Sequence, residues 1–434
     1  MQINSDILKI NKSKPFHETK NSRNMGTFIT FLIWPFLGVL LSFKNYKYYS
    51  SRNAIWLFII FIGLTFKWSY SDDTQRYVDE LVFYRNQNWN LFEFFNHIVF
   101  DKNEGRIDFI QPLINFVITK FTSDPQILLA SYGLVFGFFY SRNIWFLIDQ
   151  VEYKIKTEAL AYLLLFCFLV MPQYGINGVR YWTGVHMLMF GLINYLSLNN
   201  KIRGYVFVFG SIFMHDAHIV SIFLVLSYFL IGKNKKSLDL FFYLYLTSFV
   251  LSNVSPEFVK LIISDLPIKL KDREGYLSEE YIESVADNAN TLNWYILYQY
   301  TMMKVLVATS VIWLYYYRKS IITDNLIIRN YYSVGIIFIT FTNYVGHLPS
   351  MGRYSYLGFL SLAMALFLIF QNTPFKRRPD WYKISSLGII IILCVTKIWQ
   401  AMVNSGIDTL LANPLSLWFF NTTETLMDLV KKIS

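Results

Sequence analysis

The sequence contains little charge and almost no cysteine. Only 16% of its 434 residues are charged and 54% are hydrophobic, whereas a typical soluble domain has about 25% charged residues. The two cysteines, Cys167 and Cys394, both lie inside apolar runs and provide no disulfide framework. The first 24 residues are polar and basic, so we expect no cleavable signal peptide, which needs an apolar centre. These features exclude a soluble globular domain and a disulfide-stabilised scaffold.

The sequence also lacks the short patterns that mark common catalytic sites. It has no glycine-rich phosphate loop, no zinc-type Cys/His spacing and no Gly-x-Ser-x-Gly. ATP-driven work and a bound cofactor are therefore not expected. The apolar runs contain no chain of acidic residues at mid-span, which is the feature that marks proton-coupled transporters. The net charge is +10, but the basic residues gather in short loops, so membrane topology explains them and nucleic acid is not an expected partner.

Long apolar runs separated by short charged clusters fill most of the chain. A run of about 20 apolar residues can cross a bilayer as a helix. The pattern predicts an all-α polytopic membrane protein with about twelve transmembrane helices, two large extracytoplasmic loops and short amphipathic interfacial helices. The predicted spans are 27–43, 53–68, 126–141, 157–173, 180–198, 204–214, 217–232, 237–253, 293–316, 330–346, 353–371 and 384–402.

The charge of the connections predicts the orientation. The six short connections on one side contain 18 Lys/Arg and 4 Asp/Glu, whereas the long connections 69–125 and 254–292 contain 9 Lys/Arg and 17 Asp/Glu. Because cytoplasmic loops are rich in Lys and Arg, the long connections are expected outside. Segment 109–121 is apolar but too short to span, and its periodicity predicts an amphipathic helix at the outer interface.

The chain is expected to form one transmembrane catalytic domain. It contains no repeats, no low-complexity tract and no long linker, so the domain is placed at 25–402, between a polar basic tail (1–24) and a C-terminal tail (403–434). The basic tail would lie outside, against the charge rule. Either segment 27–43, which contains a proline, does not cross, or Met25 is the true start.

Arg180 is the first polar residue at membrane depth that needs an explanation. It opens the span 180–198, where a charged side chain is costly and is a functional candidate by default. On a helix it shares one face with Thr183, Gly184, Met187, Gly191 and Asn194. An arginine above small residues is expected to face a cavity or another helix. The alternative is an interfacial arginine that snorkels to the surface.

A second arginine and a histidine are expected on the same outer side. Arg353 enters the span 353–371, and two guanidiniums suit a diphosphate, since each can bind two phosphate oxygens in parallel. Segment 204–232 is too short for two crossings of about 20 residues each. His215 and Asp216, at its centre, are therefore expected at the floor of a recess. Imidazole can act as a base or bind phosphate; the alternative is a buried histidine bonded to a carbonyl.

The first outer loop contains the last group of candidates. Asp72 and Asp73 lie at a helix end, where carboxylates can orient sugar hydroxyls or bind a metal, and charged residues recur over 103–112. The ordinary alternative is a solvated loop. Asp73, Arg76 and Tyr77 are the residues that we single out from it.

In their order along the chain, these residues resemble the EpsG-like branch of the Wzy-type polysaccharide polymerases, over about residues 25–400. The first shared elements are an outer-loop Asp-x-x-x-Tyr (Asp73 and Tyr77) and a helix reading "IQPLINFVITKF", which contains Gln111. They are followed by an Asn-x-x-Arg (Asn177 and Arg180), a histidine after a short apolar segment (His215) and a late Arg with an aromatic residue (Arg353 and Tyr354). Two positions depart from the pattern. Gln111 stands where relatives have a carboxylate, and Tyr181 where they often have glutamine.

The resemblance implies a type C glycosyltransferase (a hexosyltransferase) at the outer face of the bacterial inner membrane. Such enzymes move a growing glycan from undecaprenyl pyrophosphate onto the non-reducing end of a fresh lipid-linked repeat unit. Arg180 and Arg353 would stabilise the leaving diphosphate, without a metal, and His215, or a carboxylate such as Asp73, would deprotonate the acceptor. Substrate contacts are expected from Asp73, Arg76, Tyr77, Gln111, Asn177 and Tyr354. Expected partners are undecaprenyl-pyrophosphate-linked oligosaccharides, the lipid bilayer and a chain-length regulator.

Three other functions fit parts of the pattern. An O-antigen ligase uses the same donor and differs only in its acceptor. A lipid-linked oligosaccharide flippase or transporter would also use arginines for a diphosphate, but it should carry charges along a path to both faces. A membrane O-acyltransferase has a histidine in the membrane, but its thioester donor is cytoplasmic, whereas His215 is expected outside.

Overall fold

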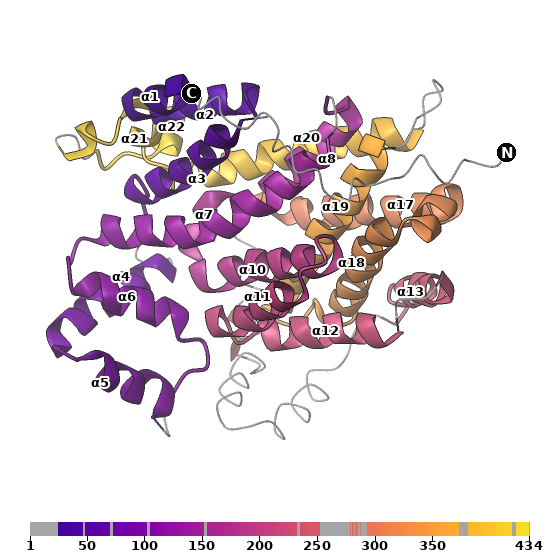
Figure 1. The fold of residues 1–434 in the computed structure, drawn as a ribbon, viewed down its shortest axis with the longest axis horizontal. Helices are drawn as coiled ribbons and strands as arrows, with labels where there is room; N and C mark the ends of the chain where they lie inside the picture. The colour runs from indigo at the N-terminus through magenta and orange to yellow at the C-terminus, as the bar shows by residue number, and fades with distance from the viewer. Residues whose placement is uncertain are drawn as a thin grey trace. The chain divides into compact units, whose positions relative to one another are not determined.

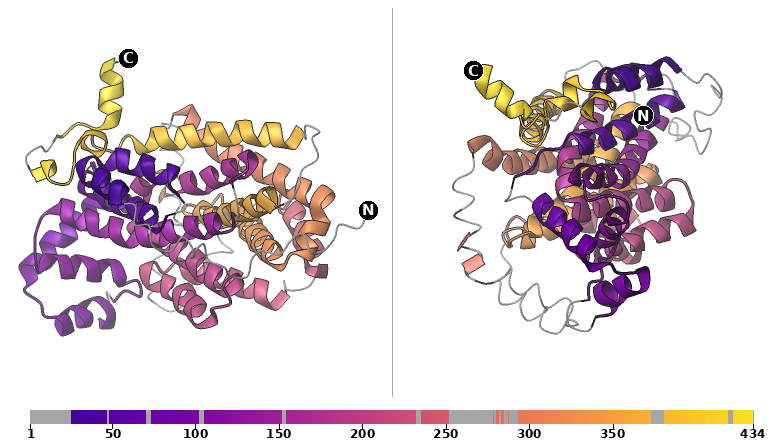
Figure 2. Two further views of the ribbon diagram at one scale, coloured as in Figure 1. Left: turned by 45° about the horizontal axis from the view of Figure 1, so that its top comes forward. Right: turned by 90° about the vertical axis from the view of Figure 1, so that its left-hand side faces the viewer.

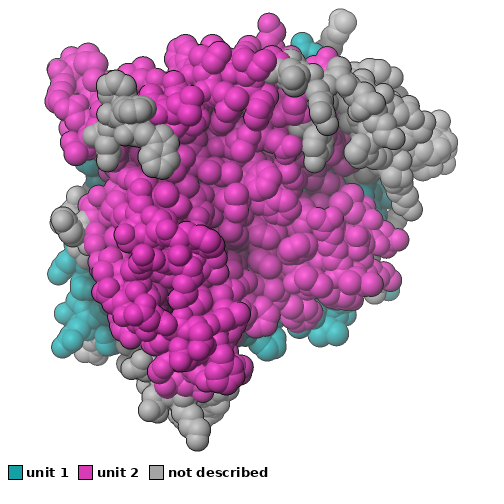
Figure 3. All heavy atoms as spheres, turned by 60° about the vertical axis from the view of Figure 1, so that its left-hand side comes forward, with its two compact units in different colours: residues 1–9, 153–169, 219–396 teal, residues 10–152, 170–218, 397–434 magenta. Residues whose placement is uncertain are grey.

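The computed structural model is helical and describes residues 25–433 except 47, 70–72, 102–104, 152–153, 232–234, 252–277, 279, 282, 285–286, 288–292, 373–380 and 419–421. The polar tail 1–24 and most of the loop 254–292 therefore lie outside the described residues. The chain divides into two compact units, which are coloured separately in Figure 3. Unit 1 is formed by the described parts of 153–169 and 219–396, and unit 2 by those of 10–152, 170–218 and 397–434.

Unit 2 contains the described part of the connection 69–125 and most of the predicted site. Its elements are α1 (Met25–Ile33), α2 (Pro35–Lys44), α3 (Tyr49–Leu64), α4 (Asp73–Gln87), α5 (Leu91–Phe95), the π-helix η2 (Asn96–Phe100), α6 (Ile110–Thr119), α7 (Pro125–Asp149), α9 (Pro172–Asn177), α10 (Val179–Leu196), α11 (Lys201–Met214), α21 (Asp408–Leu411), the short 3-10 helix η5 (Ser416–Trp418) and α22 (Leu426–Ile433).

Helices α3 and α7 cross at glycines, and so do α10 and α11, which lie side by side in Figure 1. A Cβ at Gly133 would lie 2.6 Å from the carbonyl oxygen of Ile59, and one at Gly191 would lie 2.7 Å from the backbone nitrogen of Val208. Only glycine allows backbones to approach so closely, as is common between helices in membranes. The face of α10 that begins with Arg180 thus packs on another helix.

The start of the chain does not form the single span expected over 27–43. The helix breaks at Trp34, whose φ of −149° is extended, and α2 begins at Pro35. Proline is compatible with the first turn of a helix but not with its interior, because it lacks an N–H. The Cβ position of Gly38 lies 2.6 Å from Phe31 Cα, so α1 and α2 pack directly on each other. With 9 and 10 residues, neither helix reaches the length of about 20 residues that a crossing needs.

The described part of unit 1 contains three helices of 18 residues or more, most of a fourth, and several shorter elements. They are α8 (Thr157–Leu169), α12 (His218–Ile231, from residue 219 on), α13 (Lys235–Thr247), α17 (Trp294–Asp324), α18 (Leu326–Val345), the 3-10 turn η4 (Met351–Tyr354), α19 (Ser355–Asn372) and α20 (Trp381–Ala401, up to residue 396). Stacked aromatic rings join three of them: the Trp313 ring lies 4.4 Å from that of Tyr382 and 5.7 Å from that of Phe370, centroid to centroid. The Tyr382 hydroxyl also bonds the hydroxyls of Tyr162 (2.8 Å) and Ser310 (2.6 Å).

Among the described residues, five helical segments are long and apolar enough to cross a membrane. They are Pro125–Asp149, Thr157–Asn177, Trp294–Asp324, Met351–Asn372 and Trp381–Ala401. The protein is therefore all-α with several candidate membrane spans, as the sequence predicted. The larger number of about twelve spans, their orientation and the single domain over 25–402 stay predictions. The amphipathic segment 109–121 does form a helix, α6, which buries Gln111, Asn115 and Phe116 on one face.

The C-terminal segment folds back onto the early part of unit 2. Isolated bridges join Phe66 to Ser405 and Gly406 to Thr425, and the hydroxyls of Thr65 and Thr409 are 2.7 Å apart. Both views of Figure 2 show this yellow segment beside the indigo helices α1 to α3. The residues placed in a tail at 403–434 thus include a packed part of unit 2.

Candidate active site

Arg180 is the second residue of α10, in a stretch where the helical chain restarts. Helix α9 ends at Asn177, Gly178 leaves helical geometry, and α10 starts at Val179. The Arg180 side chain is only 15% exposed. A snorkelling arginine would extend its guanidinium toward the surface, whereas this one points into unit 2.

The partner of Arg180 inside unit 2 is Asp108, 72 residues earlier in the chain. Arg180 Nη2 donates to Asp108 Oδ2, and the Asp108 side chain is 5% exposed. The Nε of Arg180 is buried and has no hydrogen-bond partner among the described residues. The Asp216 carboxylate and the Tyr77 hydroxyl also lie close enough to interact electrostatically with this guanidinium. Arg180 is therefore at the centre of a buried polar cluster.

His215 and Asp216 form the second part of this cluster. Helix α11 ends at Met214 and α12 starts at His218, so both residues lie in the short connection between them, as expected. Asp216 Oδ1 lies 2.8 Å from His215 Nδ1, and the N–H of Ala217 points at the same nitrogen from 3.1 Å. One nitrogen cannot donate and accept at once. We take Nδ1–H as the donor to Asp216, because that contact is shorter and charge-assisted.

Rings of histidine and tyrosine surround this connection. The Tyr181 ring stacks on the His218 ring at 5.1 Å and meets the His215 ring edge-on at 5.7 Å, centroid to centroid. His218 Nε2 lies 3.2 Å from the carbonyl oxygen of Tyr181. His218 thus has the partner expected for a structural buried histidine, whereas His215 has a carboxylate partner that orients its ring.

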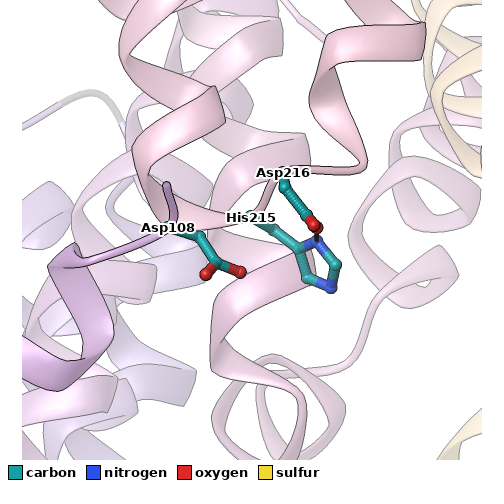
Figure 4. A group of neighbouring side chains, drawn as sticks. All are labelled: Asp108, His215 and Asp216. Atoms are coloured by element: carbon teal, nitrogen blue, oxygen red, sulfur yellow. Dashed lines mark ion pairs between the residues drawn. The ribbon is translucent and has the colours of Figure 1, made fainter. Parts of the chain in front are cut away.

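Asp108, His215 and Asp216 together have the composition of a metal site. Their ligand atoms all lie within 4.8 Å of one another. Figure 4 shows Asp108 approaching the imidazole from the segment before α6, while Asp216 meets it from the α11–α12 connection. Carboxylate oxygen and imidazole nitrogen are ligands for divalent cations. In this arrangement, however, the Arg180 guanidinium already supplies a positive charge to Asp108, so the group is equally suited to organic ion pairs.

The first turn of α4 contributes Asp73, Arg76 and Tyr77. Asp73 and Arg76 are more than half exposed, with Asp73 Oδ1 3.5 Å from Arg76 Nη2. Tyr77 is 1% exposed. Its burial, together with the Asp73 carboxylate, raises the pKa of Tyr77 to about 12, although Arg76 and Arg180 act in the opposite direction. Tyr77 is therefore a neutral phenol at physiological pH, able to hydrogen-bond but not to act as a base.

Two of the expected substrate contacts have partners inside the protein. Asn177 Oδ1 accepts hydrogen bonds from the backbone N–H and the hydroxyl of Thr74. Gln111 is fully buried, and its amide nitrogen donates to Glu80 Oε2 and to the Tyr132 hydroxyl, each at 3.0 Å. These bonds give both side chains a positioning role. Their contact with substrate stays a prediction.

Arg353 and Tyr354 belong to unit 1. They close the 3-10 turn η4, which follows Ser350, a residue with a left-handed φ of 63°, and precedes α19. Tyr354 is 3% exposed and packs edge-on against Phe341, with ring centroids 5.7 Å apart. The structure thus brings Arg180, His215 and Tyr77 together in unit 2. A shared site of these residues with Arg353 stays a prediction.

Sequence reasoning missed the importance of Asp108, Glu80 and His218. Asp108 lies in the charged stretch 103–112, whose residues could join Asp72 and Asp73 or form an ordinary solvated loop, and it is not singled out there. In the structure it is buried, and its position just ahead of an amphipathic helix was the available signal. Glu80 is bonded by Arg106, Gln111 and Asn115, and only its helical spacing from Tyr77 hinted at this. His218 follows His215 by three residues, which places two imidazoles at one turn.

Comparison with known protein families gives a match that covers most of the chain. The family model described as the EpsG family matches residues 53–414, a range that includes every residue of the cluster. No curated protein and no solved structure matches the chain. Since the match extends over most of the sequence, the chain belongs to the EpsG family.

Proposed function

We propose that this protein is a polysaccharide polymerase of the Wzy type. It transfers a glycan from undecaprenyl pyrophosphate onto the non-reducing end of a lipid-linked repeat unit, at the outer face of the bacterial inner membrane. Membership of the EpsG family suggests a role in polysaccharide biosynthesis. The observation that supports polymerase activity is that one buried cluster contains both the guanidinium of Arg180 and the imidazole of His215, which Asp216 orients.

The proposed reaction needs one group to accept a proton and another to stabilise a leaving anion. The acceptor hydroxyl oxygen attacks the anomeric carbon of the donor glycan, and the bond from that carbon to the phosphate oxygen breaks. The hydroxyl proton passes to Nε2 of His215, whose Nδ1–H is held by Asp216. The electron pair leaves with undecaprenyl pyrophosphate, and Arg180 stabilises the developing negative charge.

The remaining predicted residues have supporting roles in this proposal. Tyr77, as a neutral phenol beside Arg180, hydrogen-bonds the diphosphate or the sugar. Asp73 and Arg76 are exposed at the start of α4, where they can bind sugar hydroxyls of the incoming repeat unit. Arg353 is the second diphosphate ligand. Arg353 lies on the 3-10 turn that begins the candidate span Met351–Asn372. A guanidinium at the start of a span supports the same use as that of Arg180.

Deletion of the chain in its native host, followed by electrophoresis of lipid-linked glycans, tests the function. A polymerase defect leaves single repeat units on the lipid anchor. Loss of a ligase would instead leave polymer on the anchor, and loss of a flippase would leave single units facing the cytoplasm. Restoration of polymer by the wild-type chain but not by Arg180→Ala would support the proposal, with Arg203→Ala as the control, because Arg203 is exposed on the predicted cytoplasmic side.

A further inference from the structure

Arg180 is engaged by a carboxylate at the position where the proposed function requires a phosphate. Its Nη2 donates to Asp108 Oδ2, while its buried Nε has no partner among the described residues. Guanidinium presents five donors in a planar fork that matches carboxylate and phosphate oxygens equally well. The Asp108 carboxylate thus resembles a phosphate group of the substrate in its charge and in the oxygen atoms that it offers to Arg180.

A diphosphate and the Asp108 carboxylate compete for the Arg180 guanidinium. Each is an anion, and with both beside one guanidinium the like charges would repel at short range in a buried site. Asp216 adds a further negative charge close to Arg180. Resting on the proposed function, we infer that Asp108 is an internal counterion, which holds Arg180 while the site is empty and which the lipid diphosphate of the substrate displaces.

The backbone on the two sides of this ion pair supports an exchange of partners. Arg180 lies in the first turn of helix α10. Asp108 lies in a non-helical stretch just before α6. Two residues earlier, the N–H of Arg106 donates to the Ile98 carbonyl. The adjacent Phe109 ring is anchored against Phe213, with centroids 5.3 Å apart. The exchange requires the Asp108 carboxylate to rotate away by a change of side-chain torsion while the segment stays in place.

The exchange would stabilise the empty site and also favour release of the product. A buried arginine without an anion is costly, because its desolvation is not compensated. Asp108 removes this cost before the substrate arrives. After transfer, the carboxylate competes with the product diphosphate for Arg180 and so favours product release. The same competition weakens diphosphate binding, which is the measurable consequence.

Binding of inorganic pyrophosphate to the detergent-purified full chain, with EDTA present, tests the inference. We expect Asp108→Asn to bind pyrophosphate about tenfold more tightly than the wild type, the order of one charge-assisted hydrogen bond. Asp79→Asn is the control, since it removes the same charge from an exposed position of α4, and its affinity should stay within about twofold of the wild type. Asp108→Ser is a second variant, with the same expectation as Asp108→Asn.

The outcomes separate this inference from the proposed function. If Arg180→Gln leaves pyrophosphate binding unchanged, Arg180 is not a diphosphate ligand and the proposed function itself fails. If Arg180→Gln abolishes binding but Asp108→Asn and Asp108→Ser weaken it or leave it unchanged, only the exchange is overturned. If neither Asp108 variant folds even with pyrophosphate present, the exchange is also overturned, because an anion that the diphosphate replaces cannot be required to hold the fold.

Discussion

Asn177 caps helix α4 from 103 residues away in the chain. Its Oδ1 accepts the Thr74 backbone N–H at 3.2 Å and the Thr74 hydroxyl at 2.7 Å, and Thr74 is fully buried. The first N–H groups of a helix have no partner within it, and here the acceptor comes from the end of α9. This contact joins the turn that carries Asp73 and Tyr77 to the segment that leads into Arg180.

Asn177→Ala should lower the stability of the protein. Removing the acceptor leaves the buried Thr74 groups unpaired, at a cost of about 1–2 kcal/mol. Asn177→Asp keeps an acceptor oxygen and should stay close to the wild type, because a negative charge near a helix N-terminus is favourable. Thermal unfolding in detergent, followed by tryptophan fluorescence, measures both. An unchanged Tm for Asn177→Ala would show that the cap contributes nothing.

Lysine at position 180 or 353 should impair polymerisation severely. Lysine keeps the charge but not the planar fork that binds two phosphate oxygens, so the rate should fall by about ten- to a hundredfold. Arg203→Lys, at an exposed arginine, should leave the rate unchanged. The assay is polymerisation of lipid-linked repeat units in vitro, with gel filtration to confirm folding. Polymers of normal length from both Lys variants would contradict the diphosphate role.

Gly184→Ala should disturb the histidine cluster. A Cβ at this position would lie 2.3 Å from His218 Nε2, so the imidazole must move away from the Tyr181 carbonyl, and overpacking of this kind costs about 1–3 kcal/mol. Gly388→Ala is the matched control, because nothing lies within 4 Å of its Cβ position in α20. It should be neutral or stabilising by up to about 1 kcal/mol. Equal unfolding temperatures for the two variants would argue against the packing of His218 on α10.

Positions 180, 215 and 353 should all be reachable from the outer side of the membrane. Single cysteines at these positions, in a chain whose Cys167 and Cys394 are replaced by alanine, are expected to react with a small impermeant thiol reagent added outside. Cysteines at Arg76 and Lys201, both exposed, serve as references for the outer and inner faces. Labelling of position 180 only after the inner face is opened would exclude the proposed site.

Turnover should survive chelation of divalent ions. The Arg180 guanidinium is bound to Asp108, so a positive charge is present where a metal bound by Asp108, His215 and Asp216 would otherwise be needed. Polymerisation is measured with and without EDTA. A complete loss that manganese or magnesium restores would assign these three side chains to a metal instead, and Asp216→Asn should then weaken the restoring effect of the metal.

The sequence alone determined the local features of the fold, namely where helices form and where they break, because these depend on residues that are close together in the chain. Apolar runs and helical periodicity predicted helices of membrane length, as in α7 and α19, because side chains three and four residues apart share a face. The same periodicity predicted that the face of Arg180 meets a cavity or another helix. Two basic loops and a short apolar segment also predicted a break at His215 and Asp216.

Only the tertiary structure decided which distant residues meet. Asp108 was one of several charged residues in the long connection 69–125, and nothing local distinguished it until α6 and α10 placed it against Arg180. The fold-back of α1 on α2 and the burial of Gln111 on Glu80 are of the same kind. Such contacts join separate elements, so they depend on how helices pack and not on propensity or periodicity within any one of them.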